Sequence, residues 1–208
     1  MASAPSNTAS SAGGPGAVHL PDTARDLVKI LVAGPFGVGK TTLIDSVSEI
    51  RPLHTEEPLS EASAQVDDLD GVRDKATTTV AIDFGRISLP GDVVLYLFGT
   101  PGQERFRSLW DDIAYGALGA LVLVDSRRLD ASFDVLGLVE ESGLPYAVAF
   151  NAFPDAPRHH SEERLRRALD LEPTTPLVTC DARDAGSSID ALLALVDHLI
   201  GRDPVEAR

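Results

Sequence analysis

Apolar and polar residues alternate along this chain in blocks that differ in length and period. Short continuous apolar runs are typical of strands buried on both faces, whereas apolar residues three and four apart are typical of amphipathic helices. The runs predict strands at 27–33, 79–88, 93–98, 118–125, 145–150 and 176–180. The helical spacing predicts helices at 40–50, 130–142, 161–169 and 188–200. Ser187 and Asp190 have the spacing of a capping box, which sets the start of the last helix.

The order of these elements predicts the fold. Strands alternate with helices, which is the pattern of an α/β domain with a mostly parallel sheet. The exception is the pair 79–88 and 93–98, which only the short turn Pro90-Gly91-Asp92 separates, so this pair is predicted to form a hairpin. We therefore expect a six-stranded, mostly parallel sheet with one antiparallel edge strand and helices on both faces.

Composition marks the limits of the domain. Residues 1–24 are rich in Ser, Ala, Gly and Pro and poor in charge, which predicts a disordered N-terminal tail. The folded domain is expected to span 25–201, and 202–208 to form a short C-terminal tail. Residues 51–78 are polar and too numerous for an ordinary connection, so they are predicted to be a functional loop.

The segment between the first strand and the first helix carries the clearest chemistry. It reads Gly34-Pro35-Phe36-Gly37-Val38-Gly39-Lys40-Thr41 and fits the phosphate-binding pattern G-x-x-x-x-G-K-[ST]. Glycines let the backbone wrap a phosphate chain with its N–H groups pointing inward, and the following helix adds its positive dipole end. Lys40 is placed to reach the β- and γ-phosphates, and the Thr41 hydroxyl to ligate Mg²⁺. Thr42 completes the predicted phosphate-binding residues.

Composition and charge exclude several classes of function. The 208 residues are 43% hydrophobic, enough for one well-buried domain, and the formal net charge is -14. This charge argues against a general affinity for nucleic acid or anionic membrane, although a local nest of N–H groups with Lys40 and Mg²⁺ still binds a nucleotide. The single cysteine, Cys180, excludes an internal disulfide and favours a reducing compartment. No apolar run approaches the length of a membrane span, and Met1-Ala2-Ser3 does not resemble a signal peptide, so we expect a cytoplasmic protein.

A second motif follows the strand at 93–98. It reads Gly99-Thr100-Pro101-Gly102-Gln103-Glu104-Arg105-Phe106, where Ras-like small GTPases carry D-T-A-G-Q-E-R-F. The chain resembles this superfamily over nearly all of its folded length. The segment Thr77-Thr78-Thr79-Val80-Ala81-Ile82-Asp83-Phe84-Gly85 is similar to that of the bacterial conservon-type GTP-binding proteins, which are relatives of the gliding-motility GTPases. The resemblance implies a small G domain of the P-loop NTPase class.

The resemblance assigns roles to individual residues. Thr79 matches the switch I threonine whose hydroxyl completes the Mg²⁺ shell, so Thr41 and Thr79 are the implied metal ligands. Gly102 matches the glycine whose N–H contacts the γ-phosphate, and Gln103 matches the catalytic glutamine that orients the attacking water. Without the resemblance, Thr79 also fits an ordinary strand-opening threonine and Gln103 an exposed loop residue.

The chain departs from the family pattern at the metal and at the base. Gly99 stands where the family has a Mg²⁺-binding aspartate, so Mg²⁺ is expected to bind more weakly. Guanine is normally read by N-K-x-D, and here the segment is Asn151-Ala152-Phe153-Pro154-Asp155. Asn151 matches, Ala152 cannot supply the lysine stem, and Asp155 comes one residue late, where only a kink at Pro154 would deliver it to the base.

A third departure lies after the last predicted strand. Cys180-Asp181-Ala182-Arg183 stands where S-A-K is usual. Ala182 still has a backbone N–H for the guanine O6, and Asp181 and Arg183 fit equally well as flanks of the base or as solvated side chains.

We expect a GTP-binding molecular switch in bacterial signalling that hydrolyses GTP slowly and needs a partner for fast turnover. The alternative is a pseudo-GTPase adaptor that binds nucleotide without efficient hydrolysis, and a third class is an ATP-dependent enzyme such as a small-molecule kinase. GTP or GDP and Mg²⁺ are the expected cofactors. By resemblance, the partners are a Roadblock-domain protein and a sensor-kinase-like membrane protein that would recruit the chain to the membrane. Neither nucleic-acid binding nor direct membrane insertion is expected.

Overall fold

The computed structural model describes residues 26–58, 79–90, 92–102, 108–125, 127–153 and 161–202, and of Asp26, 53–58 and 79–81 it describes the backbone only. The predicted N-terminal tail at 1–24, all of the predicted C-terminal tail 202–208 except Arg202, the predicted catalytic residue Gln103 and the predicted base-binding residue Asp155 lie outside this description. The strands are β1 (Asp26–Ala33), β2 (Leu53–Pro58), β3 (Thr79–Leu89), β4 (Val93–Gly99), β5 (Gly119–Asp125), β6 (Tyr146–Asn151) and β7 (Leu177–Cys180). The helices are α1 (Lys40–Val47), α2 (Trp110–Ala114), the 3₁₀ helix η3 (Leu129–Ser132), α3 (Phe133–Glu141), α4 (Glu162–Ala168) and α5 (Ala185–Gly201).

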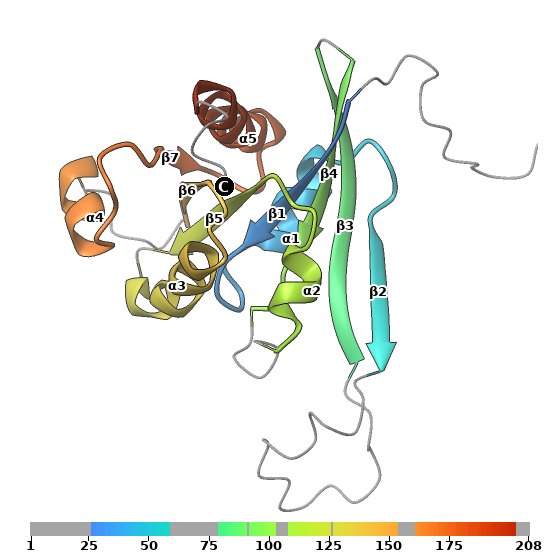
Figure 1. Ribbon diagram of the computed structural model, residues 1–208, viewed down its shortest axis with the longest axis horizontal. Coiled ribbons are helices and arrows are strands. Elements are labelled where there is room, and N and C mark those ends of the chain that lie inside the picture. Colours follow the sequence, from blue (N-terminus) through green and yellow to red (C-terminus); the bar gives the residue numbers. More distant parts are fainter. Residues whose placement is uncertain are drawn as a thin grey trace, which may run out of the picture.

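The strands form one twisted sheet in the order β2-β3-β4-β1-β5-β6-β7 (Figure 1). β4, β1, β5, β6 and β7 pair in parallel, and β3 pairs antiparallel with both of its neighbours. The predicted α/β class, the hairpin and the mostly parallel sheet are confirmed. The ligand site of such a sheet lies at the carboxyl ends of its parallel strands, and the β1–α1 loop is at that end.

One strand was not predicted. β2 lies inside the polar segment 51–78, and it makes the sheet seven-stranded and moves β3 inward from the edge. Its sequence, LHTEEP, contains no apolar run, so side-chain pattern gave no signal for it. Its pairing depends on the backbone groups that β3 would otherwise leave unpaired at the edge of the sheet.

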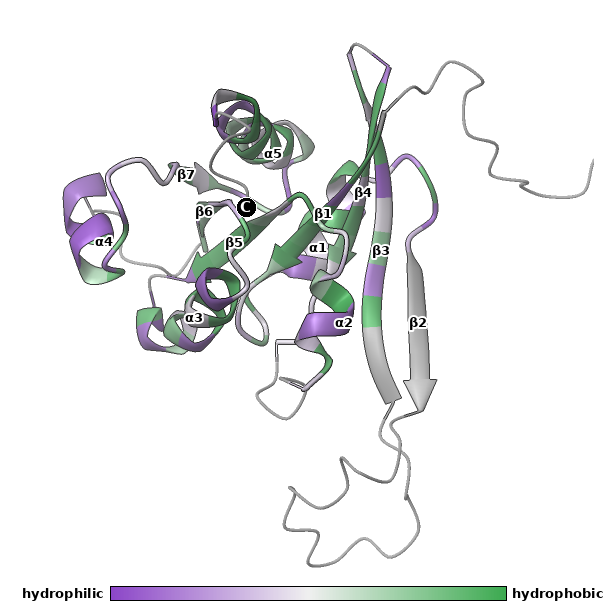
Figure 2. Ribbon diagram, viewed as in Figure 1, coloured by the Kyte–Doolittle hydropathy of each residue, from purple (hydrophilic) through white to green (hydrophobic). Residues whose placement is uncertain are grey.

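Two hydrophobic cores lie on the two faces of the sheet, because successive residues of a strand point to opposite sides. On β1, Ile30 and Val32 belong to the core beneath α1 and α5, and Leu31 and Ala33 to the core beneath α2 and α3. Figure 1 shows α5 and α3 on opposite sides of the sheet, and Figure 2 shows hydrophobic residues along β1 and β5 and hydrophilic ones over much of α4. Every residue of β5 is buried, as its continuous apolar run predicts.

The last helix begins earlier than predicted. Asp184 is its N-cap, and its carboxylate accepts the Ser187 N–H at 2.7 Å. Ser187 lies inside the first turn, where its hydroxyl accepts the Asp181 N–H at 2.9 Å. The predicted capping box at Ser187 is therefore wrong, because an aspartate three residues upstream caps the helix instead. Among the described helices, none is long and apolar enough to cross a membrane.

Candidate nucleotide-binding site

The β1–α1 loop adopts a conformation that only its glycines allow. Gly39 has a φ of 107°, and a Cβ at this position would lie 2.6 Å from the Asn151 Nδ2. Both facts exclude a larger residue. Gly39 is also the N-cap of α1, and no side chain caps this helix. The backbone N–H groups of the first turn, which point past the start of a helix, are thus directed at the loop, as in a phosphate site.

Lys40 is held inside the loop by the loop's own backbone. Its Nζ donates to the Gly34 carbonyl at 2.8 Å and to the Pro35 carbonyl at 2.9 Å. Burial lowers the pKa of Lys40 to about 8, and the nearby charge of Asp83 partly opposes this shift. A buried ammonium group without a full counter-charge favours a negatively charged ligand beside it. The predicted position of Lys40 beside the phosphates agrees with this arrangement.

A carboxylate from the neighbouring strand lies beside Gly99. Asp83 on β3 is directly opposite Gly99 on β4, and its carboxylate accepts a hydrogen bond from the Thr41 hydroxyl. A Cβ on Gly99 would lie 3.0 Å from the Asp83 Cβ and 3.2 Å from its Oδ2, so the Asp83 side chain occupies the space above the glycine. A hydroxyl and a carboxylate side by side are the oxygen donors that Mg²⁺ prefers.

Asp83 was missed as a site residue, although the sequence contains the signal. Leu89 pairs with Val93 across the turn, and counting back along both strands of the hairpin brings Asp83 opposite Gly99. Thr79, which the resemblance implies as a metal ligand together with Thr41, is the first residue of β3 and pairs with Pro58 of β2. Its side chain is not among those described, so its role as a ligand stays a prediction.

The two predicted phosphate motifs meet. A Cβ on Gly102 would lie 2.6 Å from the Lys40 Nζ and 2.6 Å from the Phe36 backbone nitrogen. The glycine after β4 therefore packs directly against the β1–α1 loop, as the resemblance implies for a residue that contacts the same phosphate. The Phe36 side chain itself is 67% exposed, and Thr41 and Thr42 are exposed at the start of α1.

Asn151 joins the phosphate loop to the end of β7. Its buried side chain donates from Nδ2 to the Val38 carbonyl at 2.8 Å and accepts the Ala182 N–H on Oδ1 at 3.0 Å. The predicted position of Asn151 at the site is supported by these contacts. The Ala182 N–H, predicted to bind guanine O6, donates to Asn151 in this structure, so its role toward a base stays a prediction.

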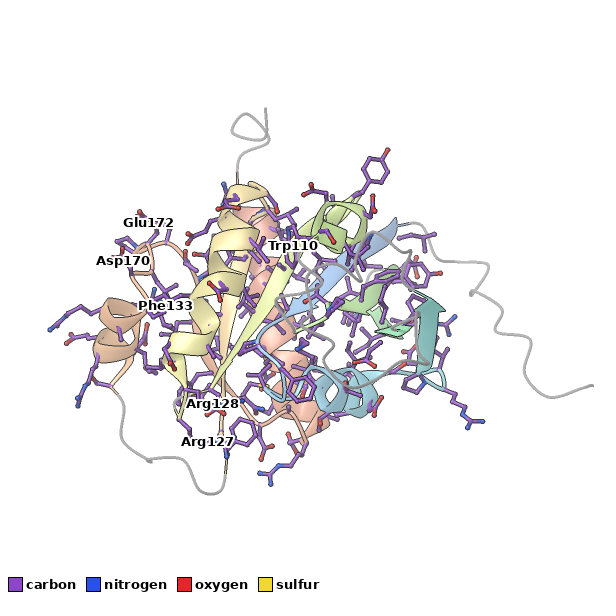
Figure 3. The ribbon with its side chains drawn as sticks, turned by 90° about the horizontal axis from the view of Figure 1, so that it is seen from below. Trp110, Arg127, Arg128, Phe133, Asp170 and Glu172 are labelled. Carbon is purple, nitrogen blue, oxygen red and sulfur yellow. The ribbon has the colours of Figure 1, made fainter. Side chains whose placement is uncertain are left out.

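The connection after β5 adds two arginines that are not among the predicted site residues. Arg127 forms an ion pair with the buried Asp125, with Nη2 2.8 Å from Oδ2. Burial raises the pKa of Asp125, but the hydrogen bonds from Arg127 outweigh burial and hold that pKa below its usual value. Arg128 donates from Nη2 to the Phe36 carbonyl at 3.0 Å. Figure 3 shows the two arginines close together, at the end of the molecule opposite to Asp170 and Glu172.

The sequence of the chain matches one family of known proteins. Residues 32–202 fit the model of a family described as conserved hypothetical ATP-binding proteins. The chain belongs to this family. A similar relative is the uncharacterized protein MJ1339 of Methanocaldococcus jannaschii, 31% identical over 129 residues that make up 61% of this chain and 71% of the relative.

Other similar proteins carry GTP-binding names or G domains. The GTP-binding protein ypt2 of Schizosaccharomyces pombe is 33% identical over 102 residues, 48% of this chain and 41% of that protein. The cytosolic domain of the T. maritima FeoB iron transporter in a GDP form superposes with a TM-score of 0.62 at 19% identity, over 85% of this chain and 64% of that one. This member of the ATP-binding-protein family therefore has the fold of a G domain.

A hollow elsewhere on the protein is separate from these motifs. It has a volume of about 540 Å³ and lies at the amino ends of β6 and β7, between Tyr146, Asp170, Glu172 and His198. None of the phosphate-loop residues lines it.

At the carboxyl ends of the strands, Asp181 and Arg183 pair with each other at 2.7 Å on the surface. The hydrogen bond from Arg183 lowers the pKa of Asp181 to about 2.

Proposed function

We propose that this protein binds guanine nucleotide with Mg²⁺ and acts as a switch that hydrolyses GTP slowly. The observation that carries the proposal is the meeting of three elements at one end of the sheet: the Lys40 loop, the Thr41–Asp83 pair and Gly102. Backbone N–H groups and Lys40 would hold the phosphates, and Thr41 with Asp83 would hold the metal ion. When bound, Mg²⁺ would neutralise phosphate charge.

The hydrolytic half of the proposal depends on the segment after Gly102. Gln103 follows this glycine directly, and its role in orienting water comes from the resemblance. A switch also needs different affinities for GDP and GTP, because a ligand that binds both conformations of the protein with equal affinity does not shift the equilibrium between them. By the same resemblance, a Roadblock-domain protein and a sensor-kinase-like membrane protein are the proposed partners.

Binding and turnover are tested with purified protein and fluorescent mant-GDP and mant-GTP, each with Mg²⁺ and with EDTA. We expect both nucleotides to bind, with different affinities, and EDTA to weaken binding. Single-turnover incubation with GTP at high protein concentration should release phosphate slowly. Binding without any release would support the adaptor alternative, and failure of both nucleotides to bind would refute the proposal.

An ATP-binding role is the second candidate, favoured by the description of the family. Competition between mant-GDP and unlabelled ATP or GTP separates the two. We expect GTP to displace mant-GDP at a lower concentration than ATP does. Displacement by ATP at the lower concentration would mean that the site prefers adenine nucleotides.

A further inference from the structure

Arg127 occupies a rigid position at the carboxyl end of β5. Its Nε donates to both carboxylate oxygens of Asp125 at 3.0 Å, and its backbone N–H donates to Oδ1 at 2.9 Å. Together with the Nη2 bond, these contacts fix the guanidinium against a buried carboxylate. An arginine held in this way loses little further freedom when a ligand binds.

The guanidinium also lies on an aromatic ring. Its Cζ is 3.8 Å from the centroid of Phe153, within the range of a cation–π contact. Phe153 is the third residue of the segment Asn151-Ala152-Phe153-Pro154-Asp155, in which guanine readers carry N-K-x-D. The side chain of Arg127 remains 31% exposed, so a ligand in solution can reach it.

This arginine is placed beside the nucleotide loop by two neighbours. Asp125, its partner, is paired in register with Asn151 on β6, and Asn151 holds the Val38 carbonyl of the loop. On the other side, Arg128 holds the Phe36 carbonyl. Arg127 therefore lies at the same end of the sheet as the loop and stacks on Phe153, the residue after Ala152, whose methyl group cannot cover a base.

We propose that Arg127, backed by Phe153, forms the surface on which the nucleotide base stacks, in place of the lysine stem that Ala152 lacks. The inference rests on the proposed function and adds how the base is held. A planar guanidinium stacks on a base of any identity, unlike a carboxylate that reads one edge. Arg127 then contributes to affinity for the nucleoside and not for the phosphates.

The discriminating variant is Arg127→Lys, which keeps a cation for Asp125 but removes the planar group. GDP and inorganic tripolyphosphate, which has no base, are each used with Mg²⁺ to displace mant-GDP, and the mant-GDP affinity itself is measured by direct titration. We expect the GDP dissociation constant to rise about tenfold, the size of one base–side-chain stack, and that of tripolyphosphate to stay unchanged. Phe153→Leu should weaken GDP in the same selective way by a smaller factor.

Arg166→Lys is the matched control, because its guanidinium pairs with Glu162 on α4 at 2.8 Å and makes the same chemical change away from the site. It should alter neither dissociation constant, and thermal melting should show all three variants folded. An equal loss of affinity for GDP and for tripolyphosphate in Arg127→Lys would mean that Arg127 has a merely structural role, and it would overturn the inference. Unchanged GDP affinity in this variant would overturn it as well. If the wild-type protein binds neither ligand, the proposed function fails instead.

Discussion

The candidate site has two ends that depend on different chemical groups. The phosphate end is the β1–α1 loop, and the base end is the proposed surface around Arg127. At the phosphate end, backbone carbonyls of the β1–α1 loop hold the Lys40 ammonium, and Gly39 has no room for a Cβ. At the base end, the contacts come from the side chains of Asp125, Asn151 and Arg127. A site made of backbone requires particular residues at particular spacings, whereas a site made of side chains can be rebuilt from a neighbouring strand. This difference explains why the first end keeps its sequence motif and the second does not.

The largest expected effect comes from Lys40→Met. This variant removes the one charged side chain of the described loop. The affinity for GDP and GTP should fall at least 100-fold, because the charged hydrogen bonds of Lys40 and its electrostatic attraction to the phosphates are lost together. Mant-GDP titration measures the loss. Lys29→Met on β1 is the control, because Lys29 donates to the Tyr115 carbonyl away from the loop. A loss below threefold would mean that the phosphate end does not bind through Lys40.

The same variant should change how the stability of the ligand-free protein depends on pH. The pKa of Lys40 is about 8 when folded and 10.5 when unfolded, so the unfolded chain binds more protons between these values. Stability of the wild type should therefore rise from pH 8 to pH 10.5, by about 3 kcal/mol in total, and the variant should lack this rise. Urea unfolding at pH 7.5 and pH 10 measures the difference. An equal pH response in both proteins would contradict the prediction.

Asp83→Asn tests whether the metal carboxylate has moved to β3. We expect the Mg²⁺ concentration needed for half-maximal GDP retention to rise roughly 10- to 100-fold, as for a lost group that orients or binds a metal. The exchange Asp83→Gly with Gly99→Asp should recover much of the loss, because it returns a carboxylate to the same space. Asp111→Asn on α2 serves as the control. A Mg²⁺ response like that of the wild type would remove Asp83 from the site.

Asn151→Ala should damage both ends at once. It leaves the Val38 carbonyl and the Ala182 N–H without their buried partner, at a cost of about 1–3 kcal/mol in unfolding free energy. Tripolyphosphate and GDP should both bind more weakly, unlike the selective loss expected at Arg127. Melting temperature and the two dissociation constants are the readouts, and unchanged tripolyphosphate binding would show that the two ends are independent.

The smallest effect is expected at the surface pair of Asp181 and Arg183. Solvent screens an exposed ion pair, so Arg183→Ala should shift the melting temperature little at neutral pH. The depressed pKa of Asp181 means that this small stabilisation is present above its ordinary pKa and is lost as the pH falls toward 2. Acid titration followed by circular dichroism tests it. A clear loss of GDP binding in Arg183→Ala would instead place this pair beside the base.

The part of the fold that follows from side-chain pattern could be predicted from the sequence. The continuous apolar run of β5 and the glycine spacing of the phosphate loop each have a direct physical cause, namely burial on two faces and a backbone without room for Cβ. β2 could not be predicted, because it pairs through backbone groups that any sequence has. Asp83 was predictable only by counting the hairpin register. The contact of Arg127 with Phe153 depends on loop geometry that no spacing encodes.

The pairing of Asp83 with Gly99 would restrict which substitutions a homologue can carry at these two positions. Carboxylates at both positions would place two negative charges against each other within the space of one side chain, and none at either would leave Thr41 without its partner. A change from one arrangement to the other by single substitutions therefore requires an intermediate protein with both carboxylates or with neither, and both intermediates are disfavoured. Homologues are therefore expected to carry an aspartate at one of these two positions and not at both.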